Sequence, residues 1–271
     1  MASITSKVET ITPEVALEIL KANTRNRPLN KRQVVYYADQ MVRGQWRLNG
    51  EPIIISNGNV LLDGQHRLAA IVKSQTTQDI LVVKGVDGDT FSTIDTGKVR
   101  TKSDVFALEG IKDYTSISTG INAYMKLCKG MYSAHNTSTT LITSTDALDE
   151  FYAHKELYIA INKSSASCYR KIRLLKQATI FGYMAYLILE KKHNEDKVYS
   201  FFNQLFGIDA IENTSISYLR DKLLQNISGQ YKMTKILQTS LVVKAWNDYV
   251  KGMQHKVLSW NADKEPMPEF I

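Results

Sequence analysis

The apolar and polar positions of the first 110 residues follow helical spacing in some stretches and strand spacing in others. Three stretches place apolar residues three and four apart, as amphipathic helices do; they are residues 12–23, 30–44 and 65–74. Thr12 and Asn30 are the expected N-caps of the first two. Residues 51–56 and 59–62 are β-rich runs on either side of an Asn-Gly pair, which predicts a hairpin or a tight strand pair. Residues 79–86 (DILVVKGV) are apolar almost throughout, which favours a central strand.

After Gly110 the spacing is helical almost throughout. The helices expected there span residues 113–129, 145–162, 166–192, 195–206, 214–226 and 232–253. The Ser- and Thr-rich stretch 137–145 is typical of a loop followed by a helix cap. The sequence therefore predicts an α+β protein, with a small mixed sheet and helices in an N-terminal domain (residues 1–110) and an all-α region in residues 111–271.

Composition limits the class of protein. A chain of 271 residues with 44% hydrophobic and 23% charged residues can bury one large core or two modest ones. The polar start carries no secretion signal and no stretch is suited to spanning a bilayer, which favours the cytoplasm. Cys128 and Cys168 lack the spacing of a metal site, so reduced thiols are expected. The net charge of +7 suits a polyanionic partner such as DNA, and an oligomer is compatible with the sequence.

The run Asp63-Gly64-Gln65-His66-Arg67 carries the strongest chemical signal, at an expected strand-to-helix transition. A helix N-terminus exposes N–H groups and the positive end of the dipole, which favours an anion, and Gly64 permits close approach or a positive φ. Arg67 can hold a phosphate through two parallel hydrogen bonds, and His66 can donate or accept near neutral pH. Asp63 could bind Mg²⁺ or accept a proton from an attacking group. The run therefore predicts a phosphate cradle beside a carboxylate.

A structural interpretation of the same run stands beside this one. Asp63 could be the helix N-cap, Gln65 a residue of the first turn, and Arg67 the ion-pair partner of an acidic side chain. Each of these residues alone is more often structural. Three together, directly after a buried strand, favour a site.

The DGQHR run resembles the signature of the ParB/sulfiredoxin-like superfamily, which includes DGQHR-domain proteins, chromosome-partition ParB N-domains, sulfiredoxins and a free serine kinase. Residues 26–32 (NRPLNKR) and 44–53 (GQWRLNGEPI) are similar to blocks of ParB-like proteins of phages and bacteria. The resemblance covers roughly residues 10–105, and the helical remainder resembles no characterised family.

The resemblance implies a nucleotide site. In the superfamily the Gly-x-x-Arg segment lies against nucleotide phosphates, those of ATP in the kinase and sulfiredoxin and those of CTP in ParB. Carried over, Gly64, His66 and Arg67 would contact phosphate, with Gln65 in the same turn. Asp63 would match the Asp of the kinase-like motif, which favours phosphotransfer or hydrolysis.

Two departures from the family limit what is carried over. Gln65 stands where the sulfiredoxin motif has its catalytic Cys, so reduction of a sulfinic acid is not expected. The Glu-Arg-Arg character of partition ParB is absent and no obvious helix-turn-helix follows, which argues against a ParB clamp. A nuclease has no independent support, because no cluster of several carboxylates is visible in the sequence.

Arg27 and Glu51 are weaker candidates near the same run. Arg27 could reach a phosphate or a DNA backbone, or it could form a structural ion pair. Glu51 could act as a general base beside Asp63, or it could be a solvated residue at a strand edge. The stretch 95–101 (DTGKVRT) is not a P-loop, because the required glycine and hydroxyl positions are not filled.

A basic stretch in the second half is a candidate contact for nucleic acid. Residues 169–176 (YRKIRLLK) place Arg170, Lys171, Arg173 and Lys176 on about two turns of an expected helix. Such a face could follow a phosphodiester backbone, with an affinity that falls as salt rises. A solvated helix face is the structural alternative.

Two functions from different classes follow from these observations. The first is a phosphotransferase or NTPase acting on or near DNA, with ATP or CTP and Mg²⁺ at the turn and with Asp63, His66 and Glu51 in catalysis. The second is a module that binds DNA or a partner protein without catalysis. A phage or mobile-element regulator, or an inhibitor of host defence, would belong to this second class.

Overall fold

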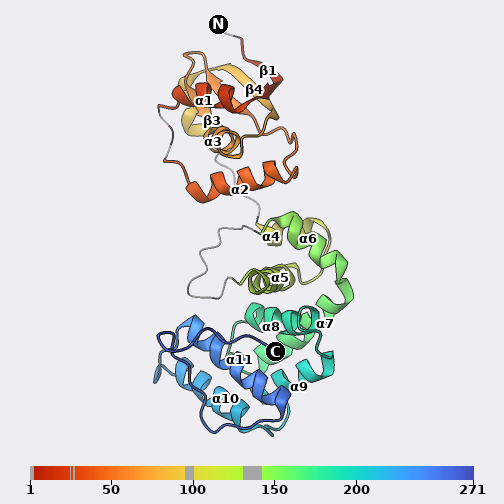
Figure 1. Cartoon of the computed structure of the whole chain (residues 1–271). Helices are drawn as coiled ribbons and strands as arrows, with labels where there is room; N and C mark the ends of the chain where they lie inside the picture. The colour runs from red at the N-terminus through yellow and green to blue at the C-terminus, as the bar shows by residue number, and fades with distance from the viewer. Residues whose placement is uncertain (1–2, 25, 27, 95–100, 131–141) are drawn as a thin grey trace. The chain divides into compact units, whose positions relative to one another are not determined.

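The computed structural model describes residues 3–24, 26, 28–94, 101–130 and 142–271 (Figure 1). Its contacts divide them into two compact units, one before residue 95 and one from Thr101 onward. Helix α4 (Lys102–Leu108), which the sequence did not predict, packs against α5 (Tyr114–Cys128) and α6 (Ser144–Ala153). These contacts place α4 in the second unit, so the division lies before Lys102 rather than at Gly110.

The first unit contains a four-stranded mixed sheet in the order β1 (Thr5–Ile11), β4 (Gln78–Val86), β2 (Ile53–Ser56) and β3 (Leu61–Asp63). Strand β4 pairs antiparallel with β1 and parallel with β2, and β2 pairs antiparallel with β3. The predicted hairpin and the predicted internal strand are both confirmed. Strand β1 was not predicted, because nearly all its side chains are exposed and only Ile11 is buried, which leaves no apolar pattern to detect.

Three helices of the first unit match the expected stretches: α1 (Pro13–Lys21), α2 (Lys31–Val42) and α3 (Gln65–Ser74). Thr12 and Asn30 accept hydrogen bonds from the first turns of α1 and α2, so both predicted caps form. A short 3₁₀ helix, η1 (Gly88–Thr93), follows β4. Helix α3 packs against both α1 and α2, and all three share a core with Ile53, Ile80 and Val82 of the sheet.

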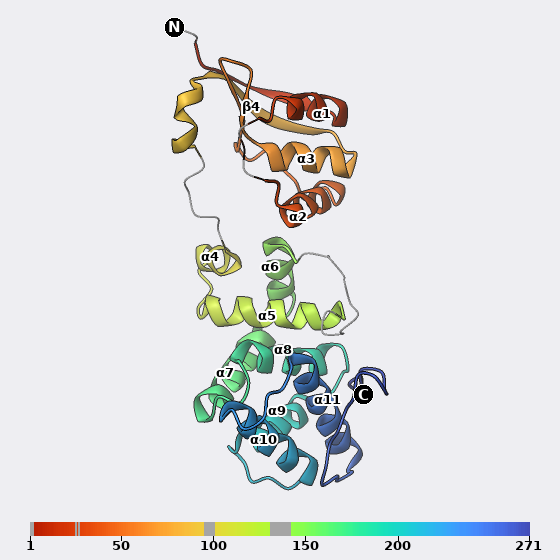
Figure 2. The same ribbon diagram turned by 90° about the vertical axis from the view of Figure 1, so that its left-hand side faces the viewer.

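Every described element of the second unit is a helix. Besides α4, α5 and α6, the helices are α7 (Lys155–Lys171), α8 (Gln177–Leu189), α9 (Glu195–Phe206), α10 (Thr214–Ile227) and α11 (Lys235–Lys251). Helices α5 and α8 lie side by side within it (Figure 2). The α+β architecture with a helical C-terminal region is therefore as the sequence predicts. No helix in the described ranges combines the length and the apolar character needed to cross a membrane.

The helical region differs from the prediction in one stretch. The helices expected at 145–162 and 166–192 are replaced by α6, α7 and α8. Helix α7 ends because Ile172 is extended (φ −160°, ψ 136°), and Leu174 and Leu175 are then buried in the helical core. Burial of these two leucines in a non-helical link outweighs the helix-forming tendency of the local sequence.

The segment after α11 runs back along the second unit. Lys244 on α11 forms an ion pair with Glu265 (2.9 Å), and Asn247 donates to the carbonyl oxygen of Glu269 at 2.9 Å. The ring of Phe270 is buried in the helical core. The sequence did not predict that this segment, which has no regular structure, completes a core.

Candidate functional site

The run 63–67 lies where β3 passes into α3. Gly64, and not Asp63, is the N-cap of α3, and it has a left-handed conformation (φ 101°, ψ 3°). A Cβ atom at Gly64 would lie 3.0 Å from Cγ1 and 3.1 Å from Cα of Ile53 on β2. Both the conformation and the close approach to β2 therefore require glycine. Because glycine has no capping side chain, the start of α3 lacks the side-chain cap that α1 and α2 have.

Arg67 is held in the turn by a carboxylate and a carbonyl group. Its Nη2 donates to Oδ2 of Asp63 at 2.8 Å and to the carbonyl oxygen of Pro52 at 2.5 Å. Its side chain is only 11% exposed. The Nε atom is buried and has no hydrogen-bond partner within the described part of the chain. A buried donor without an acceptor costs about 1–3 kcal/mol, so an acceptor brought by a ligand would be stabilising.

The two candidate carboxylates, Asp63 and Glu51, differ in their exposure and in their contacts with Arg67. The side chain of Asp63 is 26% exposed and its Oδ2 accepts the hydrogen bond from Arg67, as the structural interpretation expected. The side chain of Glu51 is 68% exposed, and its Oε2 lies 3.9 Å from Nη1 of Arg67. Among the described residues, no group of three or more His, Cys, Asp or Glu side chains could hold a metal ion. Asp63 as a magnesium ligand stays a prediction.

Three asparagines from the segment between α1 and α2 form hydrogen bonds with the turn or with β3 beside it. Asn23 donates from Nδ2 to Oε1 of Gln65 at 3.0 Å, and Asn26 donates to a carbonyl of β3 at 2.8 Å. The backbone N–H of Asn30 donates to Nε2 of His66 at 3.0 Å. Since Nε2 accepts this bond, a neutral His66 carries its proton on Nδ1. The NRPLNKR block and the DGQHR run, which are far apart in the sequence, therefore form one polar cluster.

Sequence reasoning did not assign a role to Asn23, and the resemblance included Asn26 and Asn30 only as part of a block. The available signal was the density of asparagine directly before the second helix. Arg27, which the sequence suggested as a further phosphate contact, lies outside the described residues, as does most of the stretch 95–101.

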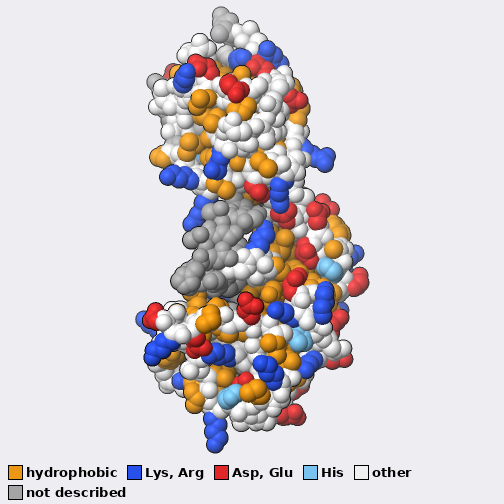
Figure 3. All heavy atoms as spheres, viewed as in Figure 1, with side chains coloured by type: hydrophobic (Ala, Val, Ile, Leu, Met, Phe, Trp, Pro, Cys, Tyr) orange, Lys and Arg blue, Asp and Glu red, His pale blue; other side chains and the backbone are white. Residues whose placement is uncertain are grey.

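The basic stretch 169–176 does not form the expected continuous helical face. Arg170 and Lys171 lie in the last turn of α7, whereas Arg173 and Lys176 follow in the link before α8. Arg173 and Lys176 line one cavity and Arg170 lines another. On the face drawn in Figure 3, Lys and Arg side chains are interspersed with Asp and Glu over both units and do not gather in one patch.

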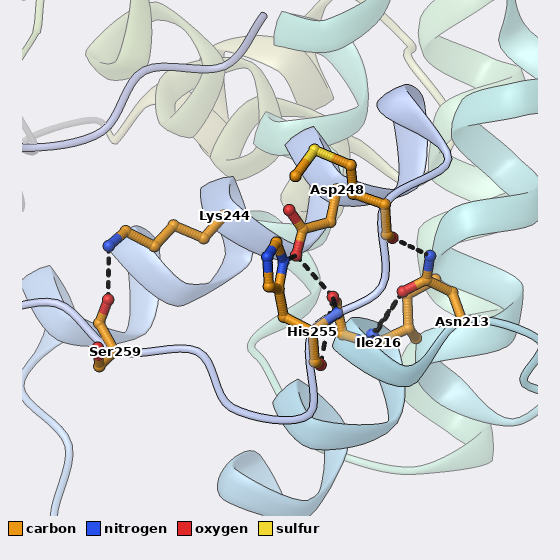
Figure 4. A network of polar contacts seen from close by, with 8 residues as sticks. Asn213, Ile216, Lys244, Asp248, His255 and Ser259 are labelled. Atoms are coloured by element: carbon orange, nitrogen blue, oxygen red, sulfur yellow. Dashed lines mark hydrogen bonds and ion pairs between the residues drawn. The ribbon is translucent and has the colours of Figure 1, made fainter.

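A second polar cluster joins Ser215 of α10, Asp248 of α11 and His255, and Figure 4 labels the last two of these residues. Ser215 Oγ donates to Oδ2 of Asp248 at 2.6 Å, and Nδ1 of His255 lies 2.8 Å from the same oxygen. The hydroxyl is bonded to the carboxylate and not to the imidazole, and Ser215 is completely buried. This is not the arrangement of a nucleophile activated by a base. The cluster instead fastens the segment after α11 to the start of α10.

The best candidate site of the described chain is thus the 63–67 turn, which combines a glycine-capped helix start and a buried arginine and lies beside the exposed Glu51. Comparison with known proteins adds no assignment to it, because no family model, no curated protein and no solved structure matches this chain.

Proposed function

We propose that this chain binds a nucleoside triphosphate, ATP or CTP, with its phosphates at the 63–67 turn. The observation that carries the proposal is the unpartnered Nε of Arg67, buried at the glycine-capped start of α3. A phosphate oxygen at this place would accept a charge-assisted hydrogen bond from the guanidinium and meet the positive end of the helix dipole. The resemblance of the DGQHR run to a phosphate-binding signature supports the same assignment.

Phosphate binding and the ion pair with Asp63 are compatible. A guanidinium has five N–H donors, and the bonds to Asp63 and Pro52 use only the Nη2 nitrogen. Nη1 lies 3.9 Å from Glu51, which is longer than a hydrogen bond. Nε and Nη1 therefore keep N–H donors, which point to different sides of the guanidinium, and a phosphate oxygen that takes a single bond from one of them need not displace Asp63.

In its catalytic form, the proposal is a phosphotransferase or NTPase acting on or near DNA. Glu51 is the carboxylate better suited to take a proton from the attacking group, because it is solvent-accessible and makes no hydrogen bond to Arg67. His66 and Arg67 would stabilise the charge that develops on the transferred phosphoryl group. Mg²⁺ bound with the nucleotide would neutralise phosphate charge, and Asp63 is the candidate protein ligand.

A binding module without turnover is the second candidate. The Asp63–Arg67 ion pair favours it, because this carboxylate is engaged before any substrate arrives. Its partner would be DNA or a protein, in a phage or mobile-element regulator or in an inhibitor of host defence, and the net charge of +7 favours DNA. For both candidates the proposed location is the cytoplasm of a bacterium or of a phage-infected cell.

Isothermal titration calorimetry with ATP, CTP, GTP and UTP, each with and without Mg²⁺, tests the nucleotide site. The site variants are His66→Ala and Arg67→Lys, and the matched control is Arg47→Ala, an exposed arginine of the same unit. We expect one nucleotide to bind the wild type and the control equally well. Arg67→Lys keeps the charge but loses the Nε donor, so binding should weaken by about tenfold or more.

The proposal fails if no nucleotide binds the wild type, or if both site variants bind as the wild type does while their circular dichroism is unchanged. An assay of phosphate release, with and without DNA, then separates the two candidates. Turnover that Glu51→Gln abolishes without loss of binding supports the enzyme. Binding without turnover under all conditions supports the module.

A further inference from the structure

A cavity of about 300 Å³ is lined by residues of the second unit alone. The end of α7, the link that follows it, the first two turns of α8 and the first turns of α11 form its walls. This volume is at the lower end of the range of small-molecule pockets and matches a compact ligand rather than a single ion.

The cavity wall is positively charged. Arg173 and Lys176 line it from the link between α7 and α8 and Lys235 lines it from α11, and no Asp or Glu is among its described lining residues. None of the three cations forms an ion pair with a described carboxylate. Lys176 is also the N-cap of α8 and gives that helix no side-chain cap, so the positive end of the α8 dipole borders the same space. The cavity therefore attracts an anion.

The floor of the cavity is apolar and aromatic. Leu174, Leu175 and Tyr183 are buried there, and the Tyr183 hydroxyl is already satisfied by Thr239 Oγ1 at 2.9 Å. At the rim, the guanidinium of Arg173 lies 5.5 Å from the ring centroid of Tyr169, which holds the cation beside an aromatic surface. A ligand that fills this space needs an apolar or aromatic body in addition to its charge.

A second cavity, of about 280 Å³, also has basic side chains on its wall but differs from the first in its charge. Arg170 and Lys163 line it together with the carboxylate of Asp113. Asp113 in turn accepts a hydrogen bond from Asn162 (3.4 Å). With a carboxylate beside its two cations, the second cavity attracts an anion less strongly than the first.

We propose that the cavity lined by Arg173, Lys176 and Lys235 binds a small organic phosphate, a phosphate group on an apolar or aromatic body of about one nucleotide in size. Such a ligand has two sources, a free nucleotide or one nucleotide of a DNA single strand. The site is separate from the 63–67 turn and does not depend on the function proposed for it.

Calorimetry on the full chain tests the proposal with four probes: inorganic phosphate, thymidine monophosphate, and a short oligothymidylate with and without a 5′ phosphate. Lys235→Ala removes a cavity charge, and Lys232→Ala removes an exposed charge three residues earlier as the control. Gln238→Trp fills the cavity without changing charge. We expect Lys235→Ala to weaken binding about tenfold or more, Gln238→Trp to abolish it, and Lys232→Ala to change it less than about twofold.

The probes distinguish the two sources of the ligand, and the variants test whether the cavity is the binding site. Equal binding of thymidine monophosphate and the 5′-phosphorylated strand, with weaker binding of the unphosphorylated strand, supports a phosphate monoester. Equal binding of the two strands, with weaker binding of thymidine monophosphate, supports a nucleotide within a strand. Inorganic phosphate binding as tightly as the organic probes would overturn the proposal, as would binding that Lys235→Ala leaves unchanged. Binding lost in Arg67→Lys but retained in Lys235→Ala belongs to the 63–67 turn and also overturns it, without affecting the function proposed for that turn.

Discussion

Asp63 and Arg67 form an ion pair, with Oδ2 and Nη2 2.8 Å apart, between the last residue of β3 and the first turn of α3. The two residues that the DGQHR run suggests for metal binding and phosphate binding therefore also contact each other. A substitution at either position changes the stability of the first unit together with the chemistry of the site. Each variant at these positions must therefore be tested both for stability and for ligand binding.

Asp63→Asn should lower the free energy of unfolding of the first unit by about 1.5–3 kcal/mol, because Arg67 loses a charged acceptor in a largely buried position. Urea denaturation followed by circular dichroism measures the change. Asp89→Asn is the matched control, since Asp89 is exposed on η1, and it should change stability by less than about 0.5 kcal/mol. Equal losses in the two variants would show that the ion pair contributes nothing.

Gly64→Ala should destabilise the first unit by more than Gly44→Ala does. Both glycines have positive φ, 101° and 66°, which costs a residue with a Cβ atom about 1–2 kcal/mol. An added Cβ at Gly64 would also be too close to Ile53, whereas an added Cβ at Gly44 would have no described neighbour within 4 Å. Overpacking adds about 1–3 kcal/mol to the Gly64 variant alone. Thermal unfolding of the two variants measures the difference, and identical midpoints would contradict the close packing of the turn on β2.

Gly120→Ala should destabilise the second unit, although alanine is the better helix former by about 1 kcal/mol. A Cβ atom at Gly120 on α5 would lie 2.6 Å from Cδ1 of Phe181 on α8, so the buried Phe181 ring or the helices themselves would have to shift. We expect a net loss of about 1–3 kcal/mol in urea denaturation. The double variant Gly120→Ala, Phe181→Leu should recover part of the loss relative to the sum of the single changes. Strict additivity would mean that the two residues do not interact.

Alkaline pH should destabilise the second unit through Tyr158. Burial and the hydrogen bond to Glu150 raise the pKa of Tyr158 above its ordinary value of 10.0. The unfolded chain loses this proton near pH 10 while the folded chain keeps it. Tyr158 therefore makes its full contribution to the free energy of unfolding below pH 10. Above pH 10 this contribution falls by about 1.4 kcal/mol per pH unit.

Tyr158→Phe supplies the measurement for this pH effect. At pH 8 the variant should be about 1 kcal/mol less stable than the wild type, because Glu150 loses its donor. The difference should shrink between pH 10 and pH 11, in urea denaturation at each pH. A difference that stays constant across this range would contradict the raised pKa.

The elements that the sequence predicts well are those whose signal is local. Helices α3 and α9 have the expected bounds, because apolar spacing fixes the helix and adjacent residues fix its start. Strand β1 and helix α4 were missed for different reasons. The first buries almost none of its side chains, and the second has only seven residues. The end of α7 was missed because it depends on the core that receives Leu174 and Leu175.

The candidate site was predictable as a run of residues but not as a set of contacts. The glycine requirement and the strand-to-helix turn follow from the DGQHR sequence itself. The partners of Arg67 do not, because several carboxylates could have reached it and only the fold places Asp63 and Pro52 against Nη2. The contribution of Asn23 depends likewise on pairing between segments that are distant in the sequence.

The two cores are completed at different points along the chain, which has a consequence for folding during synthesis. The last buried member of the first core is Val82, whereas the second core includes Leu258 and Phe270. Domains generally fold as units while the chain is made, from the N-terminus onward. The sheet that carries the 63–67 turn can therefore become native while the helical unit still lacks its closing residues. A ribosome stalled after α11 would hold a folded candidate site joined to an unfinished helical core.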